Sequence, residues 1–384
     1  MRTVRYAIFA GTAMILIAAT TALVSAQPLQ GSSLAATRNR KTDAELEALR
    51  QKSITAAVAF LRTQQLESGA FTANPRTGVG PTAVVLIGLL KCGVAQDDPM
   101  VKKAAEFLLT FARESGAIAS PGEQLANYET CVVMLALSLA DKGGAYDEVL
   151  KRADAFIRGQ QFTEANGVSP DNPNYGGAGY DGRADMSNTH FLIEALRIAG
   201  KGPDDPAIQK ALVFVSRCQN LESEHNDSPK VPKNPDGGFY YSTEDGGKSY
   251  AGETDNGGLR SYGSMTYAGF KSLIYAGLTK SDPRYLAAES WLKKNYSIDA
   301  NPGMGQRGLF YYYQLMGQTL AVTGMKTFTA DNGVEHDWRA ELIEILALRQ
   351  LPNGSYVNPE PVWMEGDASL VTGYVLMALG ECQR

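Results

Sequence analysis

Short polar side chains at positions 185–189 could carry out acid–base chemistry. The segment reads Asp-Met-Ser-Asn-Thr and leads directly into an apolar stretch. The carboxyl group of Asp185 could donate a proton, and with Asp181 it could form the pair that glycoside hydrolysis needs, about 5–10 Å apart. The same residue types also cap helices, because their oxygens accept hydrogen bonds from free backbone N–H groups. Asp185 is therefore the candidate catalytic residue, and Ser187, Asn188 and Thr189 are candidate ligand contacts.

Aromatic residues form a second set of candidates. Eleven of the 18 tyrosines lie between residues 239 and 313, and residues 310–313 read Phe-Tyr-Tyr-Tyr. Aromatic faces attract cations, including carbocations, and they also stack on sugar rings. Packing against the outside of the fold is an equally good explanation. We name Tyr311 and Tyr312 as candidate ligand contacts.

A recurring phrase indicates which elements position these residues. Phe60-Leu61 is followed by Gln64-Gln65, then Gly69 and Phe71, and related phrases begin at residues 107, 156, 214, 291 and 345. Self-similarity at this period is typical of stacked supersecondary units that cannot bury their apolar faces alone. The spacing predicts one domain over residues 43–384, built from six helix hairpins that begin near residues 45, 100, 149, 207, 284 and 338.

The second helix of each hairpin is nearly continuously apolar, whereas the first carries an apolar stripe. A helix that is apolar all round is buried on both sides, so the second helices should form an inner ring. They are predicted over residues 82–93, 130–143, 189–200, 265–277, 312–324 and 369–380. The expected fold is an all-α (α/α)6 toroid whose inner helices start at one mouth of a central cavity. Near these starts, Glu129, His190 and Asp367 are further candidate ligand contacts.

The repeat resembles a known family. A first helix ending in aromatic-Leu-x-x-Gln-Gln, followed by Gly-x-aromatic and a second helix beginning near Thr-Ala, is similar to the repeats of squalene cyclases and protein prenyltransferase β-subunits. The resemblance covers roughly residues 45–382. It implies an α/α toroid with a cavity for an apolar or isoprenoid-like molecule, but it is less specific for activity, because sites are grafted onto folds.

Set against the Asp-x-Asp-Asp-Thr motif of class II terpene cyclases, the 185–189 segment keeps Asp185 and Thr189 but has Ser187 and Asn188 at the other two aspartate positions. The middle aspartate is the general acid of those enzymes, and a serine hydroxyl is too weak an acid for that step. This departure puts cyclase activity in doubt. We expect the segment to face the cavity, with Asp185 near the positive helix end and Ser187 or Thr189 bonding free N–H groups.

Zinc prenyltransferases provide a second comparison within the resemblance. Glu129, Cys131 and His190 fall at positions similar to their Asp-x-Cys pair and histidine, and these donors suit tetrahedral zinc. However, a glutamate replaces the aspartate, and Cys131 is equally suited to a buried core position. We therefore expect no physiological zinc site and no cofactor, with Cys131 and His190 as weak candidates. Two other function classes stay open: a non-catalytic interaction scaffold, and a polysaccharide-acting enzyme.

Charge and the N-terminus restrict partners and location. Arg2 and Arg5 precede an uncharged run from residue 6 to residue 24, and Val24-Ser25-Ala26 is typical of a signal-peptide cleavage site. We predict a signal peptide over residues 1–26, a flexible tether over 27–42, and a secreted or periplasmic protein without stable membrane insertion after cleavage. With a net charge of −5, the protein lacks the positive electrostatic field that nucleic-acid binding requires.

The longest interval between repeats contains an insertion at about 220–262, rich in Gly, Asn, Asp and Ser. Long loops on a compact ring are often lids or binding loops, although they can also be surface elaborations. Cys92, Cys131, Cys218 and Cys382 are too few for a disulfide framework, and their spacing does not indicate a pairing.

Overall fold

The computed structural model describes residues 41–72, 78–122 and 124–383. Its contacts separate residues 1–41 from a second unit, Thr42–Arg384, which contains every element named below. The predicted signal peptide and nearly all of the predicted tether lie outside the described residues. No helix in the described ranges is both long enough and apolar enough to cross a membrane.

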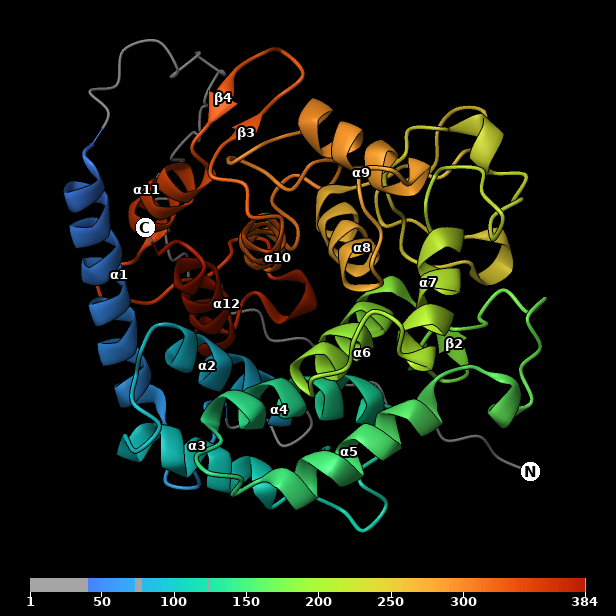
Figure 1. Ribbon diagram of the computed structural model, residues 1–384. Helices are drawn as coiled ribbons and strands as arrows, with labels where there is room; N and C mark the ends of the chain where they lie inside the picture. The colour runs from blue at the N-terminus through green and yellow to red at the C-terminus, as the bar shows by residue number, and fades with distance from the viewer. Residues whose placement is uncertain (1–40, 73–77, 123, 384) are drawn as a thin grey trace, which may run out of the picture. The chain divides into compact units, whose positions relative to one another are not determined.

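Six helices form a closed inner ring in the unit Thr42–Arg384 (Figure 1). Each contacts the next in the series, and the last contacts the first, so the ring has no open edge. Nearly every residue of these helices is buried, as their continuous apolar sequences predict. They are α2 (Val79–Lys91), α4 (Ala126–Ala140), α6 (Met186–Ile198), α8 (Gly263–Tyr275), α10 (Leu309–Val322) and α12 (Ala368–Gly380).

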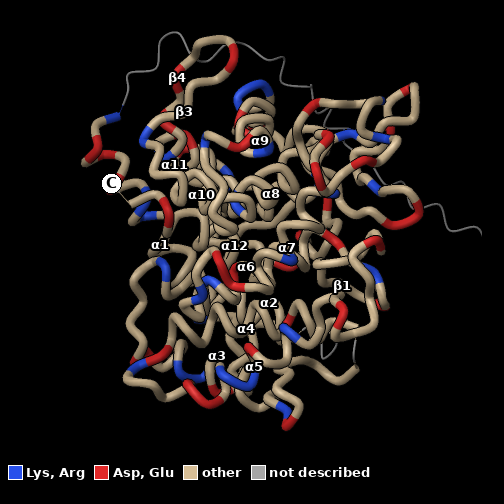
Figure 2. Tube along the Cα trace, turned by 45° about the vertical axis from the view of Figure 1, so that its right-hand side comes forward, with Lys and Arg blue, Asp and Glu red and all other residues tan. Residues whose placement is uncertain are grey.

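The remaining six long helices pack around this ring and bury only one face each. They are α1 (Asp43–Gln64), α3 (Pro99–Leu109), α5 (Asp147–Gln160), α7 (Pro206–Arg217), α9 (Pro283–Lys294) and α11 (Trp338–Arg349). Asp98, Asp205 and Asp282 cap α3, α7 and α9, and a proline follows each cap. The outer helices and loops carry most of the charged residues marked in Figure 2. The predicted (α/α)6 toroid with six apolar inner helices is confirmed.

Two small hairpins and four 3-10 helices of three residues each, η1 (Glu164–Asn166), η2 (Val231–Lys233), η3 (Glu244–Gly246) and η4 (Val362–Met364), complete the regular structure of the described ranges. Strand β1 (Gly179–Tyr180) pairs antiparallel with β2 (Arg183–Ala184), and β3 (Phe328–Thr329) pairs in the same way with β4 (Glu335–His336). The first hairpin immediately precedes α6 and so lies next to the predicted site.

The glutamine of the recurring phrase joins neighbouring repeats. The amide nitrogen of Gln161 donates to the carbonyl of Gly176 in its own turn and to the carbonyl of Ala207 in the first turn of α7, both at 2.8 Å. Gln65, Gln219 and Gln350 make equivalent pairs of bonds. One side chain therefore fixes both the turn of its own hairpin and the position of the next outer helix.

The glycine and threonine of the phrase fix the turn itself. Gly176 has φ +84°, and a Cβ atom there would lie 1.9 Å from the carbonyl oxygen of Lys210, so only glycine fits. At the start of α6, the hydroxyl of Thr189 accepts a hydrogen bond from the backbone N–H of Ala178. Threonines at the starts of four other inner helices do the same for their own turns: Thr82, Thr130, Thr266 and Thr372.

Candidate functional site

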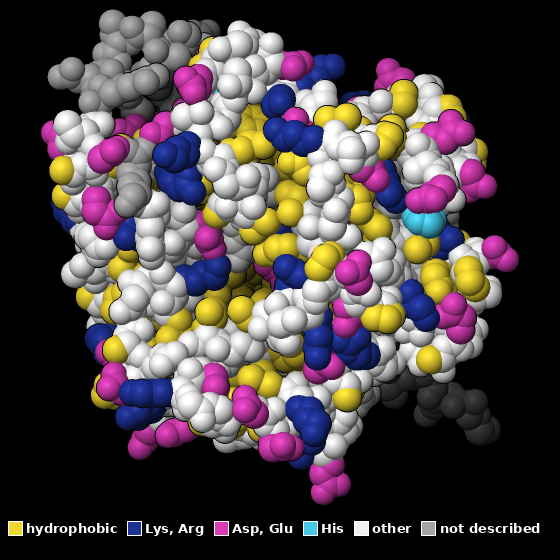
Figure 3. Space-filling model, viewed as in Figure 1, with side chains coloured by type: hydrophobic (Ala, Val, Ile, Leu, Met, Phe, Trp, Pro, Cys, Tyr) yellow, Lys and Arg dark blue, Asp and Glu magenta, His cyan; other side chains and the backbone are white. Residues whose placement is uncertain are grey.

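The starts of all six inner helices surround a cavity of about 350 Å³. Hydrophobic side chains are visible between the helices near the centre of the face shown in Figure 3. The inner helices contribute Gly80 and Pro81, Tyr128 and Glu129, Ser187 and Phe191, Ser264 and Met265, Tyr311, and Leu370 and Tyr374. The convergence of the helix starts on one cavity was predicted from the repeats.

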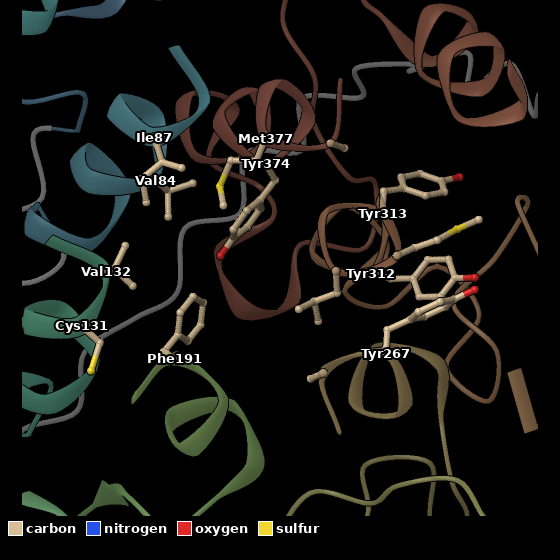
Figure 4. Close-up of a cluster of buried hydrophobic side chains, with 14 of the residues drawn as sticks. Val84, Ile87, Cys131, Val132, Phe191, Tyr267, Tyr312, Tyr313, Tyr374 and Met377 are labelled. Carbon is tan, nitrogen blue, oxygen red and sulfur yellow. The ribbon is translucent and has the colours of Figure 1, made fainter. Parts of the chain in front are cut away.

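Aromatic rings dominate the cavity wall. Phe191 meets Tyr128 edge-to-face at a centroid distance of 5.2 Å, and Tyr311 meets Tyr374 at 5.8 Å. In Figure 4, Phe191 and Tyr374 project into the space between the inner helices. Nine of the lining residues are aromatic: Tyr128, Tyr180, Phe191, Tyr241, Tyr250, Tyr262, Tyr311, Trp363 and Tyr374.

Two loops complete the wall. The insertion between α7 and α8 contributes Tyr241 and Tyr250, whose rings lie 4.7 Å apart. The loop before α12 contributes Trp363, which packs edge-to-face on Tyr250 at 5.2 Å. Trp363 and Met364 both have positive φ, at 51° and 66°, a strained conformation for residues other than glycine. The insertion thus forms part of the cavity wall and is more than a surface elaboration.

Asp185 is the N-cap of α6. One carboxylate oxygen accepts a hydrogen bond from the backbone N–H of Asn188 at 2.9 Å, and the other accepts one from the Asn188 side-chain amide at 2.8 Å. Burial raises the pKa of Asp185 to about 6. Although it is buried beside the cavity, Asp185 is not one of the lining residues. Asp181 is exposed on the β1–β2 turn and borders a different, polar pocket, so the structure does not bring these two carboxylates together in the cavity.

Contrary to the prediction from the sequence, the hydroxyl groups of Ser187 and Thr189 do not bond free N–H groups of α6. Ser187 lines the cavity, and its oxygen lies 3.1 Å from the hydroxyl oxygen of Tyr311, so it does not cap α6. Thr189 bonds the Ala178 turn instead of a free N–H of α6. Asn188 is held between Asp185 and the amide of Asn127. Only Ser187 of these three predicted contacts reaches the cavity, because a helix turns by about 100° per residue.

The remaining predicted contacts divide in the same way. Glu129 and Tyr311 line the cavity. Tyr312 packs on the other side of α10, away from Phe191 and Tyr374, and its hydroxyl donates to the carbonyl of Ser297 (Figure 4). Asp367 caps α12 by accepting from the backbone N–H groups of Ser369 and Leu370, and it is not among the residues that line the cavity.

Two carboxyl groups line the cavity. Glu129 accepts hydrogen bonds from the backbone N–H and the hydroxyl of Ser120, at 2.7 and 3.0 Å. Glu365 accepts from the backbone N–H of Tyr311 at 2.7 Å and from the side-chain amide of Asn358. Burial raises the pKa of both glutamates above the ordinary value. Sequence reasoning missed Glu365, although it lies only two residues before Asp367 in a polar turn that precedes an inner helix.

His190 and Cys131 lie within the ring and do not line the cavity. Nε2 of His190 is 3.3 Å from a carboxylate oxygen of Glu194, whose other oxygen accepts from Lys271 at 2.7 Å. Burial lowers the pKa of His190 to about 3 and raises the pKa of the Cys131 thiol. Within the described ranges, no group of three or more His, Cys, Asp or Glu side chains is arranged to hold a metal ion. His190 thus lies beside the buried ion pair of Glu194 and Lys271, and its role as a ligand contact stays a prediction.

Comparisons with known proteins extend the fold assignment. No family model matches the chain, and no curated protein matches its sequence. The type II terpene cyclase MstE from Scytonema has a similar structure, with a TM-score of 0.55 and 14% identity over 87% of this chain and 97% of that chain. A variant of MstE in complex with its substrate, geranylgeranyl dihydroxybenzoate, gives a TM-score of 0.56 and 15% identity over 88% and 99%.

A second enzyme class shares the fold. A novel alpha-amylase from Clostridium perfringens has a TM-score of 0.54 and 10% identity over 86% of this chain and 97% of that chain. At these identities the comparisons establish the shared toroid fold alone. The function must therefore be argued from the cavity.

Proposed function

We propose that the chain is an exported protein that binds an apolar or isoprenoid-like molecule in its central cavity. The observation that carries this proposal is the composition of the cavity wall, which has nine aromatic rings and no Lys, Arg or His among its described residues. A volume of about 350 Å³ lies within the range of small-molecule sites. Burying apolar ligand surface against such a wall is favourable by roughly 25 cal/mol per Å².

Binding is proposed here, and cyclisation is not. In the cyclase motif the general acid is an aspartate, whereas here Ser187 occupies that position and contacts Tyr311. The neighbouring Asp185 is committed to the N-terminus of α6 by two hydrogen bonds. The geranylgeranyl substrate named for MstE agrees with an isoprenoid-like ligand, although the likeness itself concerns only the fold.

A polysaccharide-acting enzyme is the second candidate, and one observation favours it. Glu129 and Glu365 both line the cavity and both have raised pKa values, as a general acid requires. These two glutamates replace Asp181 and Asp185 as the carboxylates to test. Hydrolysis of a soluble glucan that is abolished in both Glu129→Gln and Glu365→Gln would favour this function over ligand binding. The open cavity argues against a scaffold whose ring is filled by side chains.

The proposal is tested by titrating the mature protein with a fluorescent geranylgeraniol derivative. Ser187→Phe should fill the cavity mouth and weaken binding at least tenfold. Thr55→Phe, which adds the same ring to the exposed face of α1, is the matched control and should bind like the parent. Circular dichroism checks that each variant keeps its helices. Binding of a malto-oligosaccharide without binding of the isoprenoid would contradict the proposal.

A further inference from the structure

The described residues that line the cavity include acidic side chains but no basic ones. The wall contains two carboxyl groups, Glu129 and Glu365, and its described residues include no basic side chain. A purely hydrocarbon ligand could not form an ion pair with either carboxyl group. We propose, resting on the function proposed above, that the ligand is an organic cation: a quaternary ammonium group with apolar substituents, held by the aromatic rings and paired with Glu365.

The aromatic rings of the cavity wall can hold a cation. The face of an aromatic ring is electronegative and attracts a cation whose centre lies within about 6 Å of the ring centroid. Two rings at the cavity already do this for the chain's own cations: Lys248 lies 5.0 Å from the centroid of Tyr250, and Arg307 lies 5.3 Å from that of Trp363. The other seven lining rings, several of which pack on one another, make no such contact with a described Lys or Arg side chain, so a cationic ligand would meet no competing side-chain cation there.

Glu365 is the carboxyl group that would pair with the cation. It is 1% exposed and forms no ion pair with any described residue. Its hydrogen bonds come from neutral donors: the amide of Asn358 and backbone N–H groups at the start of α10, those of Leu309, Phe310 and Tyr311. Glu129 differs, because burial raises its pKa but the positive charge of Arg113 partly opposes that shift. A buried carboxylate without a counter-ion is unfavourable, and a cation in the cavity would remove that cost.

The positions of the rings also select the kind of cation. A quaternary ammonium group has no N–H to donate, so it loses little on leaving water and gains from several ring faces at once. Tyr311 and Tyr374 pack together, and the backbone N–H of Tyr311 binds Glu365, so these residues offer rings and a carboxylate in one place. The apolar part of the ligand would extend along Phe191, Met265 and Leu370.

The test compares two ligands of the same shape. Dodecyltrimethylammonium, used below its micelle concentration, and its neutral isostere with a tert-butyl group in place of the trimethylammonium group each compete with the fluorescent geranylgeraniol derivative. The parent protein should bind the cation roughly tenfold more tightly than the isostere. Glu365→Gln should reduce this preference, whereas Glu360→Gln, an exposed glutamate of the same loop, should leave it unchanged.

A second pair of variants tests the rings independently of Glu365. Tyr374→Phe keeps the aromatic face and should keep the preference, whereas Tyr374→Leu removes the face and should reduce it. Equal affinity for the cation and the isostere would overturn this inference and leave the proposed apolar site intact. Failure of the fluorescent isoprenoid to bind at all would overturn both.

Discussion

Asp185 should stabilise the protein more at low pH than at high pH, and this can be tested with Asp185→Ala. In the folded protein its carboxylate accepts two hydrogen bonds, from the backbone N–H and from the side-chain amide of Asn188. It is also buried, and burial raises its pKa from 3.8 to about 6. The substitution removes favourable bonds and an unfavourable buried charge together.

The magnitudes can be worked out separately. Loss of an N-cap costs about 1 kcal/mol, and leaving the buried amide of Asn188 without its acceptor costs about 1–3 kcal/mol. The pKa shift of about two units corresponds to ~3 kcal/mol in the other direction. Because the folded-state pKa is the higher one, the carboxyl group's contribution to stability is fully present below pH 3.8 and is lost as the pH rises through about 6. The alanine variant has no such loss.

Urea unfolding of the parent and of Asp185→Ala, measured at pH 3.5 and at pH 8, checks this reasoning. The variant should be less stable by about 2–4 kcal/mol at the lower pH and by no more than about 1 kcal/mol at the higher pH. Since each comparison is made at one pH, the titration of other groups cancels. The same difference in the free energy of unfolding at both pH values would refute the argument that Asp185 carries a burial penalty.

Three further predictions concern the fold and the N-terminus. Gly176→Ala should destabilise the protein by at least about 3 kcal/mol more than Gly200→Ala in thermal or urea unfolding. Both glycines have positive φ, but only Gly176 faces the Lys210 carbonyl. Equal losses of stability would show that the clash is relieved without cost. Lys271→Met should lower the free energy of unfolding by about 3–5 kcal/mol, because it leaves Glu194 buried without Lys271 as its partner. Adding Glu194→Leu should recover much of that stability in the same unfolding assay. No recovery would contradict the ion-pair account. N-terminal sequencing of the mature protein should start at Gln27 or within a few residues, and a membrane-bound product that retains Met1 would contradict export with cleavage.

The fold could be predicted because the sequence repeats the residues that build it. Gln161, Gly176 and Thr189 each make a contact that their counterparts in other repeats also make. The repeated residues of the sequence therefore correspond to repeated hydrogen bonds and close contacts in the structure. The inner ring could be predicted for a related reason, since helices buried on both sides have no polar face. Neither inference requires knowledge of the site.

The site could be predicted only in outline. The starts of the inner helices indicate where the cavity lies, but a rotation of about 100° per residue separates Tyr311, which lines it, from Tyr312, which does not. The rotation of each helix about its own axis is set by its packing against neighbouring repeats. That packing cannot be read from a single sequence. Trp363 and Glu365 come from the loop before α12, and the positive φ of Trp363 falls on a residue type that does not indicate such a conformation in the sequence.

Native mass spectrometry of the mature protein, purified from the cell that exports it, tests the central claim most directly. The protein should carry a bound molecule that organic solvent extracts and that has the mass of an apolar or isoprenoid-like compound. Ser187→Phe should lack it, and Thr55→Phe should retain it. A protein that carries no such molecule, or that carries an oligosaccharide in the same cavity, would contradict the account.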